Sequence, residues 1–141
     1  MFKEISMRSG QAIVVKGRQY IKLDVIGRGG SSKVYKVIGP DLQILALKRV
    51  NLQNTDEATV RSYLNEIALL EKLKGNPMVI SIIDSEVHQN QRVIDIVLEY
   101  GEVDLSTLLA TEEGHIDMNT IRVYWQQMLK AVKTIHEERI V

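Results

Sequence analysis

The 141-residue sequence contains no cysteine and no apolar run of the length that a membrane-spanning helix requires. Without cysteine, disulfides, thiolate metal sites and cysteine nucleophiles are all excluded. A membrane span needs ~20 apolar residues, and the first six residues also lack the apolar core of a secretory signal. We therefore expect no membrane partner, and a location in the cytoplasm or nucleus.

An excess of charge of one sign is also missing, because Lys plus Arg and Asp plus Glu both number 18. This balance argues against a basic surface for nucleic acid. The three histidines, His88, His115 and His136, are far apart and show no ligand spacing, so we expect no metal site on them. With 45% hydrophobic and 26% charged residues, the composition is that of a globular protein.

Three strands are predicted after a leader of residues 1–17 that pairs at most loosely with the domain. Ile21, Leu23 and Val25 alternate with polar residues, which is typical of a strand, and Gly27 interrupts the pattern. The second and third strands are predicted at 33–38 and 44–50, where β-branched and other apolar residues are frequent.

The period of the apolar residues changes after residue 56. Steps of three and four across 57–73 predict an amphipathic helix, for which Asn54 and Thr55 are suitable N-caps. Its expected buried stripe consists of Val60, Leu64, Ile67, Leu70 and Leu73. Strands at 79–87 and 93–98 and a short helix at 105–110 follow.

A longer helix is predicted at 117–137, with Asp117 as its N-cap. Its apolar stripe comprises Ile121, Trp125, Met128, Leu129, Val132 and Ile135. The order of three strands, a helix, two strands and two helices indicates an α+β fold.

Small residues separate the first two strands, in the segment Ile26-Gly27-Arg28-Gly29-Gly30-Ser31-Ser32-Lys33-Val34. A loop that covers nucleotide phosphates needs a close backbone approach, which glycine permits together with positive φ angles. Gly27 and Gly29 fit the spacing Gly-x-Gly-x-x-Gly, and Ser32 stands where the third glycine would be. Alone this match is weak, since a plain hairpin turn explains it equally well.

Two other nucleotide-binding loops do not fit this segment. A dinucleotide fingerprint opens a helix, whereas β-branched strand residues follow here. A Walker A loop requires Gly-Lys-Ser/Thr, which the sequence lacks. A glycine loop between two strands is the arrangement that covers ATP in protein kinases.

Two charged residues lie on faces that are otherwise apolar. Lys48 shares a strand face with Ala46 and Val50, and Glu66 shares a helix face with Tyr63. Each has an ordinary explanation, because the lysine stem can pack while its head stays in water and the glutamate can reach water from the edge of its stripe. Together they would neutralise each other, and the pair would hold Lys48 toward the α- and β-phosphates of ATP.

Apolar side chains and a strand end complete the candidate pocket. The adenine ring would lie between Val34 and Ala46, with Ile26 above it, although a core role suits all three. At Leu98-Glu99-Tyr100-Gly101 the chain leaves the sheet, and the Glu99 carbonyl and Gly101 amide would bond to the adenine edge. Asp104 is a candidate for a ribose hydroxyl, and a helix cap is as good an explanation.

These residues resemble the protein kinase family over nearly the whole chain. The resemblance makes Ile26–Val34 the glycine-rich loop, Lys48 the third-strand lysine, Glu66 the glutamate of helix αC, Leu98 the gatekeeper and 99–101 the hinge. It implies a small lobe at 18–101, with a five-stranded antiparallel sheet and helix αC. Helices αD and αE of the large lobe would follow at 102–141.

A closer resemblance rests on the segments Gly29–Val34, Ser62–Ile67 and Val103–Leu105, and on Val15-Lys16-Gly17. They resemble the monopolar-spindle checkpoint kinases, dual-specificity enzymes in which a serine replaces the third glycine. The resemblance implies ATP and Mg²⁺ as ligands, protein substrates among kinetochore components, and a location at the kinetochore and spindle.

The sequence departs from the family where Ile140-Val141 resembles the residues just before the catalytic loop. The catalytic aspartate, the magnesium-binding asparagine and Asp-Phe-Gly are not found, so we expect the chain alone to transfer no phosphate. The stripe of the last helix would be partly bare, which favours poor solubility, self-association or contacts with the small lobe. Three interpretations stay open: the ATP-binding half of a checkpoint kinase, a non-catalytic nucleotide-binding or regulatory module, and a kinase of another subfamily.

Overall fold

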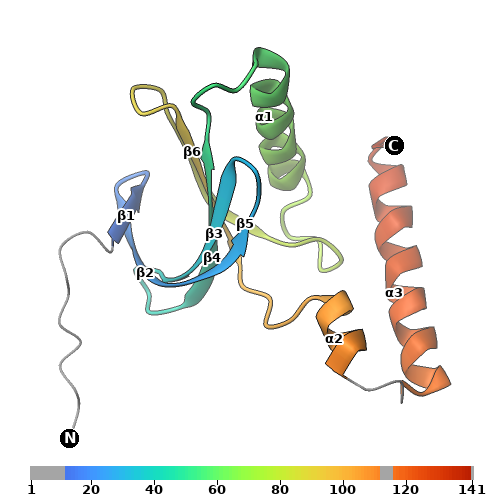
Figure 1. The fold of residues 1–141 in the computed structure, drawn as a ribbon. Helices are drawn as coiled ribbons and strands as arrows, with labels where there is room; N and C mark the ends of the chain where they lie inside the picture. Colours follow the sequence, from blue (N-terminus) through green and yellow to red (C-terminus); the bar gives the residue numbers. More distant parts are fainter. Residues whose placement is uncertain (1–11, 112–115, 141) are drawn as a thin grey trace, which may run out of the picture.

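The computed structural model describes residues 12–111 and 116–140, and shows an antiparallel sheet with a helix against one face and two more helices beyond it (Figure 1). In chain order the elements are β1 (Ala12–Val15), β2 (Arg18–Arg28), β3 (Ser32–Ile38), β4 (Ile44–Asn51), α1 (Glu57–Lys72), β5 (Ile82–His88), β6 (Val93–Glu99), α2 (Leu105–Thr111) and α3 (Met118–Glu137). The predicted α+β fold is therefore confirmed.

The sheet has six strands in the order β1-β2-β3-β4-β6-β5, all antiparallel to their neighbours. Its first and last strands approach each other, because Lys16, which follows β1, pairs with Asp84 on β5 at 3.2 Å. The Lys16 amide also donates to the carboxylate of Glu86. The sheet is therefore strongly curled, with β1 folded toward β5.

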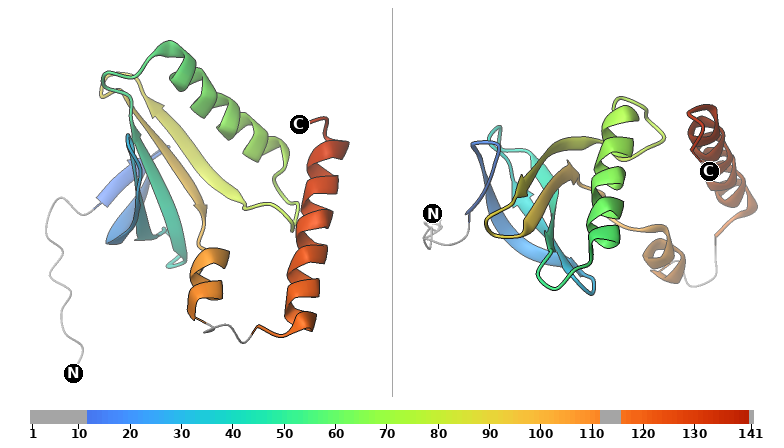
Figure 2. Two further views of the ribbon diagram at one scale, coloured as in Figure 1. Left: turned by 45° about the vertical axis from the view of Figure 1, so that its right-hand side comes forward. Right: turned by 90° about the horizontal axis from the view of Figure 1, so that it is seen from above.

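Each face of the sheet carries its own apolar cluster, and α1 covers only one of them (Figure 2). We call the face under α1 the inner face and the opposite one the outer face. The inner cluster comprises Val50, Leu52, Ile82, Ile94 and Ile96, with Val60, Tyr63, Ile67, Leu70 and Leu98 packed on it. The outer cluster comprises Ile13, Val15, Tyr20, Val37, Leu45, Leu47 and Val97.

The strand β1 is the main departure from the predicted five-stranded sheet. The sequence predicts a loosely paired leader here, but Ile13 and Val15 are both buried in the outer cluster. The positive φ angles of Lys16 and Gly17 turn the chain back into β2. A four-residue strand is too short for its alternation to stand out in the sequence, and residues 1–11 of the leader lie outside the described part.

The first predicted strand is also longer and less regular than expected. β2 begins at Arg18 and continues past Gly27, with register irregularities between Lys22 and Asp24 and again before Gly27. Leu23 and Val25 are both exposed, so the alternation of this strand does not mark a buried face. Such bulges shift side chains between faces, which makes simple alternation misleading. β5 likewise begins at Ile82, three residues later than predicted.

The helix α1 forms where the period of apolar residues predicted it, with two differences. Its N-cap is Asp56, whose carboxylate accepts the Thr59 amide at 2.7 Å, so neither Asn54 nor Thr55 is the cap. Tyr63 packs on the inner cluster, whereas Leu64 is 43% exposed. The stripe is therefore rotated toward the side that carries Glu66.

The last two helices continue beyond the end of β6 (Figure 1). Asp117 caps α3 as predicted, accepting the Thr120 amide at 2.8 Å. The apolar stripe of α3 is bare, and Trp125 is 61% exposed. Among the described residues, no helix is both long and apolar enough to cross a membrane.

Candidate nucleotide site

An ion pair between β4 and α1 is the centre of the candidate site. The Nζ atom of Lys48 lies 2.9 Å from Oε1 of Glu66. Their side chains are 23% and 44% exposed, so the pair sits at the open edge of the inner face and Glu66 also reaches water. Such a pair adds little to stability. Its effect is to fix the ammonium group in place, and the predicted contact between the two residues is confirmed.

The glycine-rich segment forms a tight loop at the end of the β2–β3 hairpin. The Gly29 amide donates to the Ser32 carbonyl at 2.8 Å, which closes the turn. The Asn51 amide donates to the Ser31 carbonyl, also at 2.8 Å, and fastens the loop to the end of β4. The loop is therefore held on both sides by backbone hydrogen bonds.

Backbone angles do not explain the glycines of this loop, contrary to what the sequence suggested. Gly27, Gly29 and Gly30 all have negative φ angles or extended backbone, without positive φ. A Cβ atom at Gly29 would lie 2.8 Å from Oγ of Ser32, whereas one at Gly30 would meet open space. That oxygen ends a side chain that can rotate away, so crowding at Gly29 is only a weak reason for glycine.

Tyr63 joins the loop to the ion pair, a role that sequence analysis missed. Its hydroxyl oxygen lies 3.2 Å from Oγ of Ser31, and Nζ of Lys48 lies 5.5 Å from the centre of its ring. Tyr63 is three residues before Glu66, so both point from one face of α1. The sequence shows that Tyr63 and Glu66 share a face, but it does not show that the ring contacts Ser31 and Lys48.

The candidate adenine wall lies on the same inner face as Lys48. Val34 pairs across the strands with Lys48, and Ala46 pairs with Leu98. Ala46 is buried, Val34 and Leu98 are partly buried, and Ile26 at the end of β2 is exposed. These side chains form an apolar strip beside the charged pair, which suits a flat aromatic ring.

The predicted hinge begins where β6 ends at Glu99. The Glu99 amide donates to the Ser81 carbonyl at 2.9 Å, and Nζ of Lys36 lies 4.8 Å from the centre of the Tyr100 ring. Gly101 follows outside the sheet and is exposed. The chain therefore leaves the inner face directly beside Leu98 and Ala46.

Asp104 is a helix cap in this structure. Its two carboxylate oxygens accept the amide and the hydroxyl of Thr107, each at 2.8 Å. These hydrogen bonds, the one from the amide first, lower the pKa of the Asp104 carboxyl below its usual value. The capping alternative is confirmed, and the ribose contact stays a prediction.

Arg28 and Lys33 are members of the glycine-rich segment that the structure separates from Lys48. Both are exposed, and they are cross-strand partners of each other. Lys33 is also paired with Arg49, and strand alternation puts these side chains on the outer face. Their charges therefore do not converge with Lys48 on the inner face.

His115 and Asp117 match the spacing of the His-x-Asp motif of a kinase catalytic loop, but Asp117 is a helix cap in this structure. The Asp117 carboxylate accepts both the amide and the hydroxyl of Thr120 at the start of α3. His115 lies outside the described residues, as does Val141. Within the described ranges, no group of three histidine or acidic side chains is arranged to hold a metal ion.

The chain is similar to protein kinases over nearly its whole length. A family model of the protein kinase domain matches residues 20–141. Serine/threonine-protein kinase mph1 of Schizosaccharomyces pombe is 44% identical over 139 residues, covering 97% of this chain and 20% of that protein. Probable serine/threonine-protein kinase mps1 of Dictyostelium discoideum is 45% identical over 141 residues, covering 98% of this chain and 14% of that protein.

A vertebrate relative shows the same likeness. Dual specificity protein kinase TTK of Mus musculus is 41% identical over 132 residues, covering 93% of this chain and 15% of that protein. The chain thus spans no more than a fifth of the length of these three relatives.

Proposed function

Because this chain belongs to the protein kinase domain family, we propose that it binds ATP and is the nucleotide-binding part of a protein kinase. The whole protein would transfer the γ-phosphate of ATP to hydroxyl groups of proteins. One observation carries this proposal: Nζ of Lys48 is held 2.9 Å from Glu66, on the inner face beside the glycine-rich loop. Lysine and glutamate in these positions are the pair that kinases require for positioning phosphates.

Each residue of the site has a task in this proposal. Lys48 would bind the α- and β-phosphates as a charged donor, while Glu66 keeps its side chain from turning away. The apolar strip of Val34, Ala46 and Leu98 would accept the adenine ring, and the backbone of Glu99 and Gly101 its polar edge. ATP itself supplies the phosphoryl group.

Magnesium is a different case, because the residues present do not fit it. Mg²⁺ is bound in kinases by an aspartate and an asparagine beyond the small lobe, together with the phosphates. The described part of the chain has no group of three acidic or histidine side chains that could serve, and the sequence has no Asp-Phe-Gly. We therefore assign no magnesium ligand to this chain.

The names of the relatives support a more specific proposal about which kinase this is. We infer dual specificity for serine, threonine and tyrosine, and a role in the spindle checkpoint, from the likeness to monopolar-spindle kinases. Kinetochore proteins as substrates, and a location at the spindle within the cytoplasm or nucleus, belong to the same inference. A labelled form of the whole protein that avoids kinetochores in mitotic cells would contradict it.

We further propose that the 141 residues alone do not transfer phosphate, because the sequence provides no aspartate in a catalytic-loop context. The test compares phosphate transfer to a generic protein substrate by the chain and by its Lys48→Met variant. Turnover by the chain above that of the variant would refute this part of the proposal.

The main test measures the affinity of the chain for a fluorescent ATP analogue. We expect Lys48→Met to weaken binding by about 10- to 100-fold, since a charge-assisted contact contributes about 1.5–3 kcal/mol. Lys74→Met is the matched control, because Lys74 is exposed beyond α1, and it should leave affinity unchanged. Equal affinity of the chain and the Lys48 variant would overturn the assignment of the site.

A further inference from the structure

A row of five charged residues crosses the outer face of the sheet. Cross-strand pairing joins Arg28 to Lys33, Lys33 to Arg49, Arg49 to Asp95, and Asp95 to Glu86. Directly paired residues in an antiparallel sheet share a face, so the row reads as three cations followed by two carboxylates. Charge is thus separated along the row, with the positive end at the glycine-rich loop.

The middle of the row neutralises itself. Asp95 is completely buried and accepts Nε and Nη2 of Arg49, each at 2.7 Å, and these hydrogen bonds raise the pKa of Arg49. His88 lies 3.1 Å from the same carboxylate. The negative charge of Asp95 is therefore neutralised by Arg49, and it does not balance the charges of Arg28 and Lys33.

The positive end is left without a carboxylate. No ion pair involves Arg28 or Lys33 within residues 12–111 and 116–140. Like charges directly opposite each other across strands are destabilising. Lys33 faces Arg28 on one side and Arg49 on the other. An anion placed here would relieve this repulsion.

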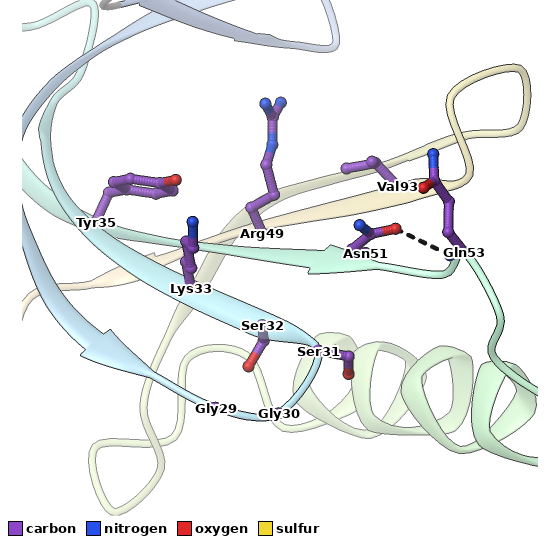
Figure 3. A pocket seen from close by; sticks show the side chains of 10 residues that line it. All are labelled: Gly29, Gly30, Ser31, Ser32, Lys33, Tyr35, Arg49, Asn51, Gln53 and Val93. Carbon is purple, nitrogen blue, oxygen red and sulfur yellow. Dashed lines mark hydrogen bonds between the residues drawn. The ribbon is translucent and has the colours of Figure 1, made fainter.

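A cavity of about 390 Å³ opens at this point (Figure 3). Lys33 and Arg49 rise from the same side of the sheet in that view, and no acidic residue lines the cavity. Its other walls are Gly29, Gly30, Ser31, Ser32, Tyr35, Asn51, Gln53 and Val93. The loop that borders it is also linked to the candidate nucleotide site, since Oγ of Ser31 lies 3.2 Å from the Tyr63 hydroxyl.

The polar groups of the lining are mostly donors. The side-chain oxygen of Asn51 accepts the Gln53 amide at 2.9 Å, which leaves its NH₂ group for a ligand. Arg49 uses Nε and Nη2 on Asp95 and keeps Nη1. Together with the Lys33 ammonium, these groups match an anion with several acceptor oxygens.

We propose that this cavity binds a phosphate group, held by Lys33, Arg49 and Asn51 against the outer side of the glycine-rich loop. Arg28 adds positive charge from the next strand. The volume exceeds that of one phosphate and lies at the small end of the range for ligand pockets. It therefore has room for a phosphorylated side chain as well as for free phosphate. This site is separate from the proposed ATP site, which lies on the inner face.

The test is a titration of the chain with sodium phosphate at constant ionic strength, followed by the amide NMR signals of Ser32, Lys33 and Asn51. We expect saturable shifts in the chain and at least about fivefold weaker binding in Lys33→Gln. Lys74→Gln, an exposed charge elsewhere, and Lys48→Met should both bind phosphate as the unchanged chain does. Exposed Lys33 can be replaced without disturbing the fold.

Two results would overturn the proposal. One is shifts that chloride reproduces at equal ionic strength. The other is binding that Lys48→Met abolishes and Lys33→Gln does not, since the phosphate would then occupy the inner face. Failure of the proposed ATP site would appear separately, as loss of nucleotide affinity in the first experiment.

A second titration distinguishes the source of the phosphate. N-acetyl-phosphoserine amide is compared with inorganic phosphate, and N-acetyl-serine amide is the control. Tighter binding of the phosphoserine compound supports a phosphorylated side chain as occupant, and equal binding supports free phosphate. Absence of saturable binding by both phosphates overturns the site.

Discussion

The hydroxyl oxygen of Tyr63 lies 3.2 Å from that of Ser31, and this contact ties α1 to the tip of the glycine-rich loop. The same ring lies below Nζ of Lys48, whose partner Glu66 is one helical turn further along α1. Loop, lysine and helix are therefore linked through one side chain. A shift of α1 would move all three together.

Removing this hydroxyl should weaken nucleotide binding without unfolding the chain. We expect Tyr63→Phe and Ser31→Ala each to lower affinity for the fluorescent ATP analogue about two- to tenfold, since one hydrogen bond contributes about 0.5–1.5 kcal/mol. The double variant should lose little more than either single one, because both remove the same contact. Strictly additive losses would show that the two residues act independently.

Replacing the buried carboxylate Asp95 should be far more damaging than replacing an exposed carboxylate such as Asp41. Asp95→Ala leaves Arg49 and His88 without their partner, and we expect the free energy of unfolding to fall by about 2–4 kcal/mol. The value lies toward the low end for buried pairs, because the Arg49 side chain is itself 34% exposed. Urea denaturation measures the change, with Asp41→Ala in the exposed β3–β4 turn as the control. A loss below that of the control would contradict the assignment.

The sequence predicted the contact between Lys48 and Glu66, because the alternation of one strand and the period of one helix are enough to find it. Lys48 lies in an apolar strand and Glu66 on an apolar helix face. A charge on either face alone would be unfavourable, whereas the two charges neutralise each other. The structure brings them to 2.9 Å. Helix α3 was equally easy to predict, because its apolar residues keep the helical period over a long segment and Asp117 marks its start.

What the sequence did not predict depends on which surfaces meet in three dimensions. Ile13 and Val15 look like a short apolar run, and only the curl of the sheet toward β5 buries them. Asp95 stands inside an apolar strand as Lys48 does, but its partner Arg49, on the same outer face, is 46 residues away in the sequence. Periodicity shows which residues share a face, but it does not show what covers that face.

Acid should destabilise α3 only below the ordinary pKa of aspartate, where its N-cap Asp117 gains a proton. Hydrogen bonds from Thr120, the amide first, lower the pKa of the Asp117 carboxyl from its ordinary value of 3.8. A carboxylate with a lowered pKa in the folded state stabilises the fold fully above 3.8. That contribution disappears as the pH falls through the lower folded value.

Circular dichroism at 222 nm between pH 7 and pH 2 would follow this loss. We expect constant helix content at neutral pH and a decline only below the ordinary aspartate pKa. Asp117→Ala should have less helix at pH 7 and a smaller decline, whereas Asp41→Ala, in the exposed β3–β4 turn, should behave as the unchanged chain does. Identical pH curves for all three proteins would rule out the cap as the cause.

The bare stripe on α3 should make the chain associate with itself. Burying one leucine contributes about 1.5–3 kcal/mol, so Leu129→Lys should weaken self-association about tenfold or more in sedimentation experiments. Leu42→Lys is the matched control, because Leu42 is 84% exposed in a turn far from α3. The single Trp125 reports the same event, since its emission should shift to the blue as the stripe is covered. A monomer at all concentrations would contradict this prediction.

The amide of Asn51, bonded to the Ser31 carbonyl at 2.8 Å, has a consequence for how the loop moves. The β3–β4 ladder begins at Ser32 and Val50, so this bond adds one rung beyond it. The loop therefore cannot move at the hairpin tip alone, because this hydrogen bond to β4 must break before the loop lifts. The hydrogen-exchange rate of the Asn51 amide would therefore report how often the loop lifts, because this amide exchanges only when its hydrogen bond to Ser31 is broken.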